Sequence, residues 1–231
     1  MAKKKLQRFA EIPKFNNVVQ AGVDEVLNNE HRLCGKWGEF FFCSPNPIVI
    51  ELGCGKGEYT VGLANLFPER NFLGVDIKGS RIWSGARHAY ENKMQNAGFL
   101  RTRIEMISSF FEREEIDQIW LTFPDPQLKK ARKRLTSPAF LNRYRRFLRS
   151  GGPVHLKTDS LELHNYTLSV IRANGLELLE ATTDLYSSVH AREENSIKTY
   201  YETRYLEQGK SICYLKFKVD CLKEIEDPDE N

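Results

Sequence analysis

Short apolar runs rich in β-branched residues alternate with helical patterns through most of this 231-residue chain. The runs lie at residues 45–52, 71–77, 99–106, 116–123 and 153–159. The helical patterns lie at residues 58–67, 79–96, 137–150 and 160–174. Strands and helices that alternate at this spacing form a parallel sheet with helices on both faces, and right-handed crossovers limit it to a doubly wound α/β fold. Ligands of such folds bind beyond the carboxyl ends of the strands.

The two ends of the chain depart from this alternation. Residues 1–20 are polar and basic, and a moderately amphipathic helix is expected around 21–35. Residues 176–219 suggest a strand, a long polar loop, a short helix and a last strand. With 41% hydrophobic residues, the chain can bury the core of one sizeable domain.

Positive charge is concentrated in one segment. Nine Lys or Arg and no Asp or Glu lie between Lys129 and Arg149, while the C-terminal KEIEDPDEN is acidic and the net charge is only +3. A basic patch on a nearly neutral protein indicates a polyanionic partner. A solvated helix face is the alternative.

Several classes of protein are disfavoured. The N-terminal MAKKKLQRF has no apolar segment behind it, and no run approaches the roughly 18 apolar residues of a membrane span. Five cysteines without a C-x-x-C pair and histidines without ligand spacing argue against a metal site. We therefore expect a cytoplasmic protein with free thiols, no membrane and no metal.

A glycine-rich loop follows the first strand, in the segment ELGCGKG from Glu51 to Gly57. Glycines at 53, 55 and 57 allow positive φ and close approach of a ligand to the backbone. A dinucleotide fingerprint would need glycine at 58, where Glu58 stands. The loop thus suits a nucleoside without phosphates better than NAD, although a tight structural turn is the alternative.

Two acids lie near this loop. Asp76 ends the second strand, where a carboxylate can accept both ribose hydroxyl protons in NAD enzymes and in enzymes that use S-adenosylmethionine. Capping of the next helix is the alternative role. Glu51 favours S-adenosylmethionine, because a negative charge attracts an ammonium or sulfonium and repels a pyrophosphate.

The fourth strand ends in the segment TFPDP, with Asp125 between Pro124 and Pro126. Each proline fixes its own φ near −65° and restricts the residue before it. The sequence predicts a stiff elbow that presents one carboxylate at the sheet edge, which suits the positioning of a reactive atom. A plain turn with an exposed Asp is the alternative.

These segments, in this order, resemble the bacterial tRNA (guanine-N7-)-methyltransferase family. The resemblance is carried by ELGCGKG, GVDI, TFPDP with the following lysines, LKTDS at 156–160 and TYYE at 199–202. It implies a Rossmann-like methyltransferase fold: a doubly wound, mostly parallel seven-stranded sheet with an antiparallel C-terminal strand. It also implies a methyltransferase domain at 45–220, preceded by a basic arm and helix at 1–44 that is a candidate for RNA contact, and followed by an acidic tail at 221–231.

The resemblance also implies roles for individual residues. S-adenosylmethionine would be bound by Glu51, Gly53, Gly55, Asp76, Asp125 and, through its backbone, Arg103. Asp125 would lie at the methyl-transfer centre. The RNA would be contacted by Lys129, Asp159, Thr199, Tyr200, Tyr201 and Glu202. The implied substrate is the guanosine at position 46 in the variable loop of tRNA. Two residues depart from the family pattern: Gln127 stands where many members have Trp, and Arg103 where many have an acid.

Guanine N7 carries a lone pair and no proton, so its methylation needs no general base. Asp125 is therefore predicted to position the guanine edge or to stabilise its developing positive charge, and Asp159 and Glu202 are alternative acceptors. The competing hypotheses are a methyltransferase of another RNA site, a nicotinamide-dependent oxidoreductase, and a non-catalytic RNA-binding protein. The sequence does not define the oligomeric state.

Overall fold

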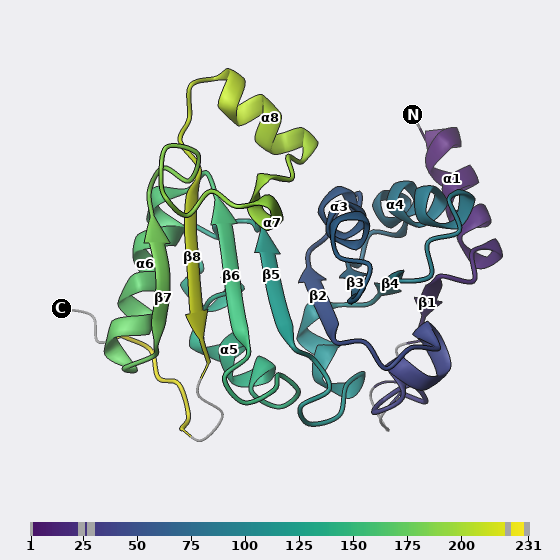
Figure 1. The fold of residues 1–231 in the computed structure, drawn as a ribbon, viewed down its shortest axis with the longest axis horizontal. Coiled ribbons are helices and arrows are strands. Elements are labelled where there is room, and N and C mark those ends of the chain that lie inside the picture. The colour runs from purple at the N-terminus through teal and green to yellow at the C-terminus, as the bar shows by residue number, and fades with distance from the viewer. Residues whose placement is uncertain (1, 23–25, 27–30, 220–222, 229–231) are drawn as a thin grey trace.

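The computed structural model is built on one eight-stranded sheet, in the order β1-β4-β3-β2-β5-β6-β8-β7 (Figure 1). It describes residues 2–22, 26, 31–219 and 223–228. The strands are β1 Val18–Gln20, β2 Ile48–Leu52, β3 Asn71–Val75, β4 Ala97–Arg101, β5 Gln118–Thr122, β6 Pro153–Thr158, β7 Leu178–Thr182 and β8 Cys213–Lys218. β8 runs antiparallel to β6 and β7, and the other neighbouring strands are parallel. The predicted α/β fold class is confirmed.

The chain winds in opposite directions from the centre of the sheet. From β2 it proceeds to β3 and β4 on one side, and from β5 to β6 on the other. β2 and β5 are hydrogen-bonded neighbours, with Glu51 in register with Trp120. The carboxyl ends of β2 and β5 therefore form the topological switch point, where doubly wound folds place their ligands.

Helices cover both faces of the sheet. The α-helices are α1 Ala2–Glu11, α3 Glu58–Leu66, α4 Gly79–Glu91, α5 Pro138–Tyr144, α6 Leu161–Ala173, α7 Glu193–Ser196 and α8 Tyr200–Glu207. The 3-10 helices are η1 Ile12–Lys14, η3 Ile104–Ser109 and η4 Ala131–Lys133, and η2 Trp37–Phe42 is a π-helix. In Figure 1, α8 stands beyond the arrowheads of β5 and β6, on the carboxyl side of the sheet. No helix in the described part of the chain is long and apolar enough to cross a membrane.

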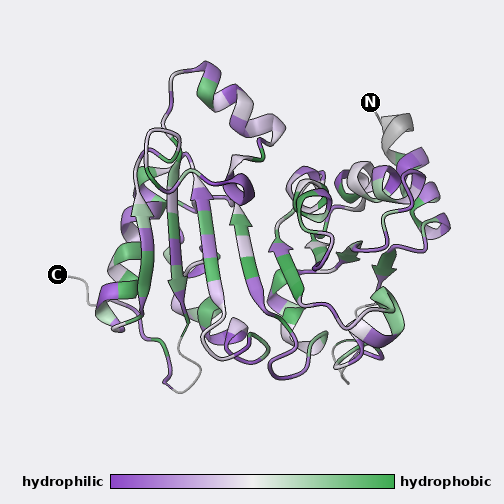
Figure 2. Ribbon diagram, in the orientation of Figure 1, coloured by the Kyte–Doolittle hydropathy of each residue, from purple (hydrophilic) through white to green (hydrophobic). Residues whose placement is uncertain are grey.

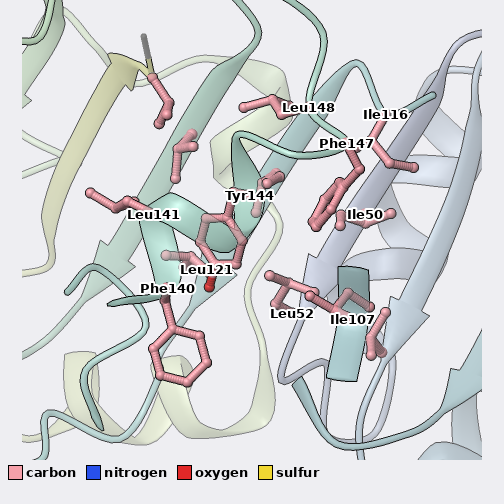
Figure 3. Packing of buried hydrophobic residues seen from close by; sticks show 14 of the residues in the cluster. Ile50, Leu52, Ile107, Ile116, Leu121, Phe140, Leu141, Tyr144, Phe147 and Leu148 are labelled. Carbon is pink, nitrogen blue, oxygen red and sulfur yellow. The ribbon is translucent and has the colours of Figure 1, made fainter. Parts of the chain in front are cut away.

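Successive strand residues point to opposite faces, which gives the molecule two separate cores. Ile50 and Leu52 pack with α5 and α6 in the larger core, of which Figure 3 shows the part around Tyr144 and Phe147. Val49 and Trp120 pack with α3 and α4 on the other face. Figure 2 shows the strands as mostly hydrophobic (green) and the helices as a mixture of hydrophobic and hydrophilic (purple) residues, as expected where helices cover a sheet.

The second face also buries polar side chains. Glu51, Thr122, His155 and Lys157 are all buried, and each is flanked along its strand by an apolar residue of the larger core. Alternation therefore turns these four side chains toward α3 and the segment at 184–207. A polar group in a low-dielectric interior is costly unless it is hydrogen-bonded. We therefore expect each of these four side chains to have a hydrogen-bond partner.

The N-terminal part contributes more structure than the sequence predicted. Residues 1–20 were predicted as a polar lead-in, yet they contain α1 and the edge strand β1, which pairs with β4 and raises the strand number from seven to eight. α1 packs on α4, where Trp83 donates to Glu11 at 2.7 Å and Arg8 stacks on the Trp83 ring at 4.7 Å. A three-residue strand carries too little alternation to be predicted.

Several predicted boundaries were wrong. The third strand, predicted at 99–106, is β4 at 97–101, and the chain then turns into η3. The helices predicted at 79–96 and 137–150 end at Glu91 and Tyr144. Phe40 to Phe42 lie in the π-helix η2, where Phe42 is buried and Phe40 exposed. Of the helix predicted around 21–35, residues 23–25 and 27–30 lie outside the described residues, and 32–35 form a turn.

Candidate functional site

A hollow of about 510 Å³ lies at the switch point, beyond the carboxyl ends of the central strands. This volume lies within the range of small-molecule sites. Its walls come from the glycine loop, the ends of β3, β4 and β5, and α5. The lining residues are Gly53, Asp76, Ile77, Lys78, Arg81, Thr102, Arg103, Ile104, Glu105, Phe123, Pro124, Asp125, Gln127, Leu135 and Phe140.

The glycine loop is held open by its backbone. Gly53 and Gly55 have φ of 82° and 56°, in the left-handed region that favours glycine. A Cβ at either position would meet nothing closer than 4.0 Å, so both glycines border open space. Gly57 differs, because a Cβ there would lie 2.5 Å from the Phe99 ring. The first two glycines thus leave room for a ligand, and the third lets the loop pack against the core.

Asp76 is fixed by the backbone on both sides. Its Oδ2 accepts the Gly55 N–H at 3.0 Å and its Oδ1 accepts the Lys78 N–H at 2.7 Å. The residue is only 8% exposed, yet it lines the hollow. Beside it, Ile77 is 47% exposed, and together with Ile104 it offers an apolar surface for a flat base. An acid beside an apolar slot matches the chemistry of an adenosine.

Glu51 lies beneath the loop and is not among the residues that line the hollow. Its Oε2 accepts the Thr60 N–H at 2.9 Å and the Thr60 hydroxyl, and its Oε1 accepts the Thr122 hydroxyl. Burial raises the pKa of Glu51 from 4.5 to about 7; the charge of Asp76 adds to the rise, and the bonds from Thr122 and Thr60 oppose it. Glu51 thereby ties the first turn of α3 to β5 below the glycine loop.

The TFPDP elbow presents Asp125 at the opposite wall. Phe123 and Gln127, on either side of the two prolines, have φ of 48° and 45°. Left-handed backbone at non-glycine residues is uncommon and costs energy, and it concentrates at functional sites. Asp125 is exposed, and its Oδ1 accepts the Gln127 N–H at 3.0 Å. The prolines make the elbow stiff, and the two left-handed residues set its direction.

The third wall contains an acid that the sequence analysis missed. Arg103 is exposed in the lining, as predicted for a strand end, and Glu105 lies in the lining two residues later. The sequence placed Glu105 inside a strand, but β4 ends at Arg101 and η3 carries Glu105 to the hollow. The acid that Arg103 lacks is therefore available from Glu105. The sequence did contain an indication that the strand ends early: the segment RTRIE at 101–105 is too polar for a buried strand.

Thr199 and Glu202 shape the start of α8. The Thr199 hydroxyl accepts the Glu202 N–H at 3.2 Å, and Glu202 accepts the Thr199 N–H at 3.3 Å, in a capping box. Glu202 is fully buried and forms an ion pair with Lys157 at 2.8 Å. Tyr200 and Tyr201 are about half exposed, with ring centroids 5.6 Å apart. Thus α8 exposes the tyrosines and buries the glutamate.

The remaining predicted RNA contacts lie around the elbow. Lys129 is exposed, and Asp159 accepts a hydrogen bond from Lys210 at 3.0 Å. Arg134, within the basic segment, is buried: it donates to the Pro126 carbonyl at 2.9 Å and pairs with Glu162. The basic segment therefore has an outer part that faces solvent and an inner arginine that supports the elbow.

The described residues contain no group of three His, Cys, Asp or Glu side chains that could hold a metal ion. Cys43, Cys54 and Cys213 are free thiols. The site is therefore built from backbone, carboxylates and cations.

A doubly wound sheet with an open glycine loop, an acid at the next strand end and a second acid on an elbow is typical of enzymes that bind a cofactor containing a nucleoside. A family model described as "Putative methyltransferase" (Methyltransf_4) matches residues 45–215. Among solved structures, the 16S rRNA methyltransferase KamB shares the fold with a TM-score of 0.59 at 15% identity, over 76% of this chain and 88% of that one. The 16S rRNA (adenine(1408)-N(1))-methyltransferase from Catenulisporales acidiphilia, with cosubstrate SAM, aligns with a TM-score of 0.52 at 16% identity over 78% and 88%.

The curated relatives are far closer in sequence. The tRNA (guanine-N(7)-)-methyltransferase of Christiangramia forsetii is 48% identical over 94% of this chain and 99% of its own length. That of Bacteroides fragilis is 49% identical over 99% of this chain and 91% of its own length. The chain therefore belongs to the tRNA (guanine-N(7)-)-methyltransferase family. This membership confirms the predicted family and its S-adenosylmethionine cofactor.

Proposed function

We propose that this enzyme methylates N7 of a guanosine in tRNA, at position 46 of the variable loop. The observation that carries the proposal is the hollow that joins the cofactor residues to the elbow: Gly53 and Asp76 line it together with Asp125, although they lie far apart in sequence. The names of the relatives support the choice of base and of RNA.

The residues of one wall fit S-adenosylmethionine. Open space at Gly53 and Gly55 admits a ligand against the backbone, and Asp76 suits the ribose hydroxyls. Glu105 is placed to accept from an adenine amino group, with the backbone of Arg103 beside it. Glu51 is buried beneath the loop, where it holds the first turn of α3 through Thr60. The bound cofactor supplies an electrophilic methyl carbon, which the N7 lone pair takes as the carbon–sulfur bond breaks and sulfur keeps the electrons.

The elbow positions the base. Since N7 has no proton to lose, the protein must contribute alignment and electrostatics, and alignment alone can lower a barrier by roughly 7–11 kcal/mol. Of the three candidate acceptors, Asp125 is exposed, whereas Asp159 pairs with Lys210 and Glu202 with Lys157. The geometry therefore favours Asp125 for the guanine edge or for the charge that develops on it.

The tRNA backbone would be held outside the hollow. Lys129, Lys130, Arg132 and Lys133 are exposed next to the elbow, where they can neutralise phosphates without reading sequence. Tyr200 and Tyr201 offer exposed rings on which a base can stack. Because the substrate is tRNA, we expect the reaction to take place in the cytoplasm.

The test is a methylation assay with unmodified tRNA and labelled S-adenosylmethionine, followed by nucleoside analysis. The expected product is 7-methylguanosine, and borohydride with aniline should cleave the tRNA in the variable loop. The matched control is the same tRNA with adenosine in place of that guanosine, which should accept no methyl group. Label in another nucleoside, or cleavage elsewhere, would contradict the proposal.

A further inference from the structure

Lys157 is a buried cation near the carboxyl end of β6, next to the apolar Leu156. It lies on β6 with no exposed surface, on the sheet face that residues 184–207 cover. Its ammonium donates to the Asn195 carbonyl at 2.7 Å and the Ile197 carbonyl at 3.0 Å, and it pairs with Glu202 at 2.8 Å. An ammonium has three N–H donors, so these contacts use all of them.

The acceptors of Lys157 belong to the segment that leads into α8. Asn195 and Ile197 precede the helix, and Glu202 lies in its first turn. Tyr186, earlier in the same segment, donates its hydroxyl to Glu202 at 2.5 Å and lies 3.3 Å from the ammonium. The Lys157 side chain thus connects the loop at 195–197 and the first turn of α8 to the carboxyl end of β6.

The backbone of Lys157 holds the elbow. Its carbonyl accepts the Phe123 N–H at 2.7 Å, at the residue where the left-handed turn toward Asp125 begins. The Phe123 ring in turn lies 6.0 Å from that of Tyr205 on α8. The elbow and α8 are therefore fixed relative to each other through one residue.

Stability alone does not account for this buried ion pair. Removing two charges from water costs free energy, and apolar pairs of similar volume often serve a fold as well or better. Such pairs are retained where they specify one arrangement. Here the arrangement is that of α8, whose Tyr205 lies beside Phe123 of the elbow and whose Tyr200 ring lies 4.2 Å from the Lys56 ammonium of the glycine loop.

We propose that Lys157 is a positioning residue for the tRNA substrate: it acts through Glu202 and the 195–197 carbonyls to hold α8 beside the elbow that carries Asp125. The inference rests on the proposed function, since it assigns α8 to the RNA side of that site. Lys157 touches neither the cofactor wall nor the reacting atoms in this account, so its loss should affect tRNA more than S-adenosylmethionine.

The test uses the pair Lys157→Met with Glu202→Gln, which leaves no unpaired buried charge and retains Gln as a capping residue at the third helical position. We expect an unchanged dissociation constant for S-adenosylmethionine and a kcat/KM for tRNA that falls on the order of 10²-fold, mainly through KM. Hydrogen exchange of the backbone amides at 193–207 should become faster. Glu202→Gln alone should have a smaller effect, because Gln still accepts from Lys157.

The control is Lys218→Met, which removes a lysine paired with Glu177 at 3.0 Å at the opposite end of the sheet and should leave KM and exchange unchanged. A folded double variant with wild-type KM and exchange would overturn the proposal, as would an equal loss in Glu202→Gln alone. If the double variant does not fold, Lys157→Arg is measured instead. Wild-type KM and wild-type exchange in that variant would also contradict the proposal. Absence of 7-methylguanosine with the wild-type enzyme would instead refute the proposed function, while the exchange measurement still tests the anchoring.

Discussion

Asp76 and Asp125 line the same hollow, but the chain holds the two carboxylates in different ways. Asp76 is almost buried, both of its oxygens accept backbone N–H groups, and the positive φ values beside it belong to glycines. Asp125 is exposed, accepts one backbone N–H, and is flanked by left-handed Phe123 and Gln127. The proposed cofactor wall places its positive φ values at glycines and buries its acid, whereas the elbow has strained backbone and an exposed acid.

This difference matches the two ligands. A small nucleoside benefits from a preformed slot whose polar groups are already oriented. A tRNA is too large to be enclosed, so the group that meets its base must project from the surface and be held rigidly at its root. We infer that the left-handed turns at Phe123 and Gln127 provide this rigidity where glycine would allow motion.

The largest expected effect is on turnover when Asp125 is changed. Asp125→Asn keeps an acceptor for the Gln127 N–H but removes the charge, so kcat should fall about 10² to 10³-fold while the dissociation constant for tRNA changes little. Asp184→Asn is the matched control, because Asp184 also accepts one backbone N–H, from Ser187 at 3.4 Å, in a partly exposed loop. A wild-type kcat in Asp125→Asn would show that the Asp125 charge does not contribute to methyl transfer.

The stability of the fold should show a pH dependence that originates at Glu51, beneath the glycine loop. Its pKa is about 7 in the folded protein and near 4.5 unfolded, so the folded state binds the proton more tightly and the contribution to stability is lost as pH rises from 4.5 through 7. The free energy of unfolding of the wild type, relative to Glu51→Gln, should fall by about 3 kcal/mol over that range. Urea denaturation at several pH values measures it, and parallel curves for the two proteins would contradict the burial argument.

Glycine at 57 should matter through packing. Gly57→Ala and Gly175→Ala both place a side chain at positive φ, but only the Cβ at 57 meets a neighbour, at 2.5 Å, while nothing lies within 4 Å of the one at 175. Gly57→Ala should therefore destabilise the fold by about 1–3 kcal/mol more than Gly175→Ala. Equal midpoints of urea denaturation would show that the loop does not pack as tightly as described.

The basic segment should contribute a modest, salt-dependent term on the open side of the hollow. In Lys129→Ala with Lys130→Ala, the slope of log K for tRNA against log salt should become less negative by about 0.7 to 0.9 for each phosphate that is no longer neutralised. Lys218→Ala with Lys223→Ala removes the same charge away from the hollow and should leave the slope unchanged. An unaltered slope in the first variant would remove these lysines from the RNA interface.

The sequence was sufficient to predict the sheet and the position of Asp76 beside the glycine loop, because both depend on local patterns. Alternating runs predict parallel strands, and the spacing from the glycine loop to Asp76 is a property of consecutive segments. The acid at the TFPDP elbow was predictable for the same reason, since prolines restrict their immediate neighbours.

What the sequence did not predict depends on contacts between distant segments. Glu105 reaches the hollow only because β4 ends at Arg101, and Lys157 meets a partner in Glu202 that no periodicity connects to it. The same holds for Arg134, which looked like one more cation of a surface segment but turns inward to the Pro126 carbonyl. A lysine inside the apolar run PVHLKTD was the available signal for the buried pair.

The most direct measurement is calorimetric titration of S-adenosylmethionine into the wild type, Asp76→Asn, and Lys129→Ala with Lys130→Ala. The account predicts binding to the wild type, an equal dissociation constant for the lysine variant, and about tenfold weaker binding or worse for Asp76→Asn, since a hydrogen bond to a charged group contributes about 1.5–3 kcal/mol. Equal affinity of Asp76→Asn and the wild type would contradict the placement of the cofactor against this wall.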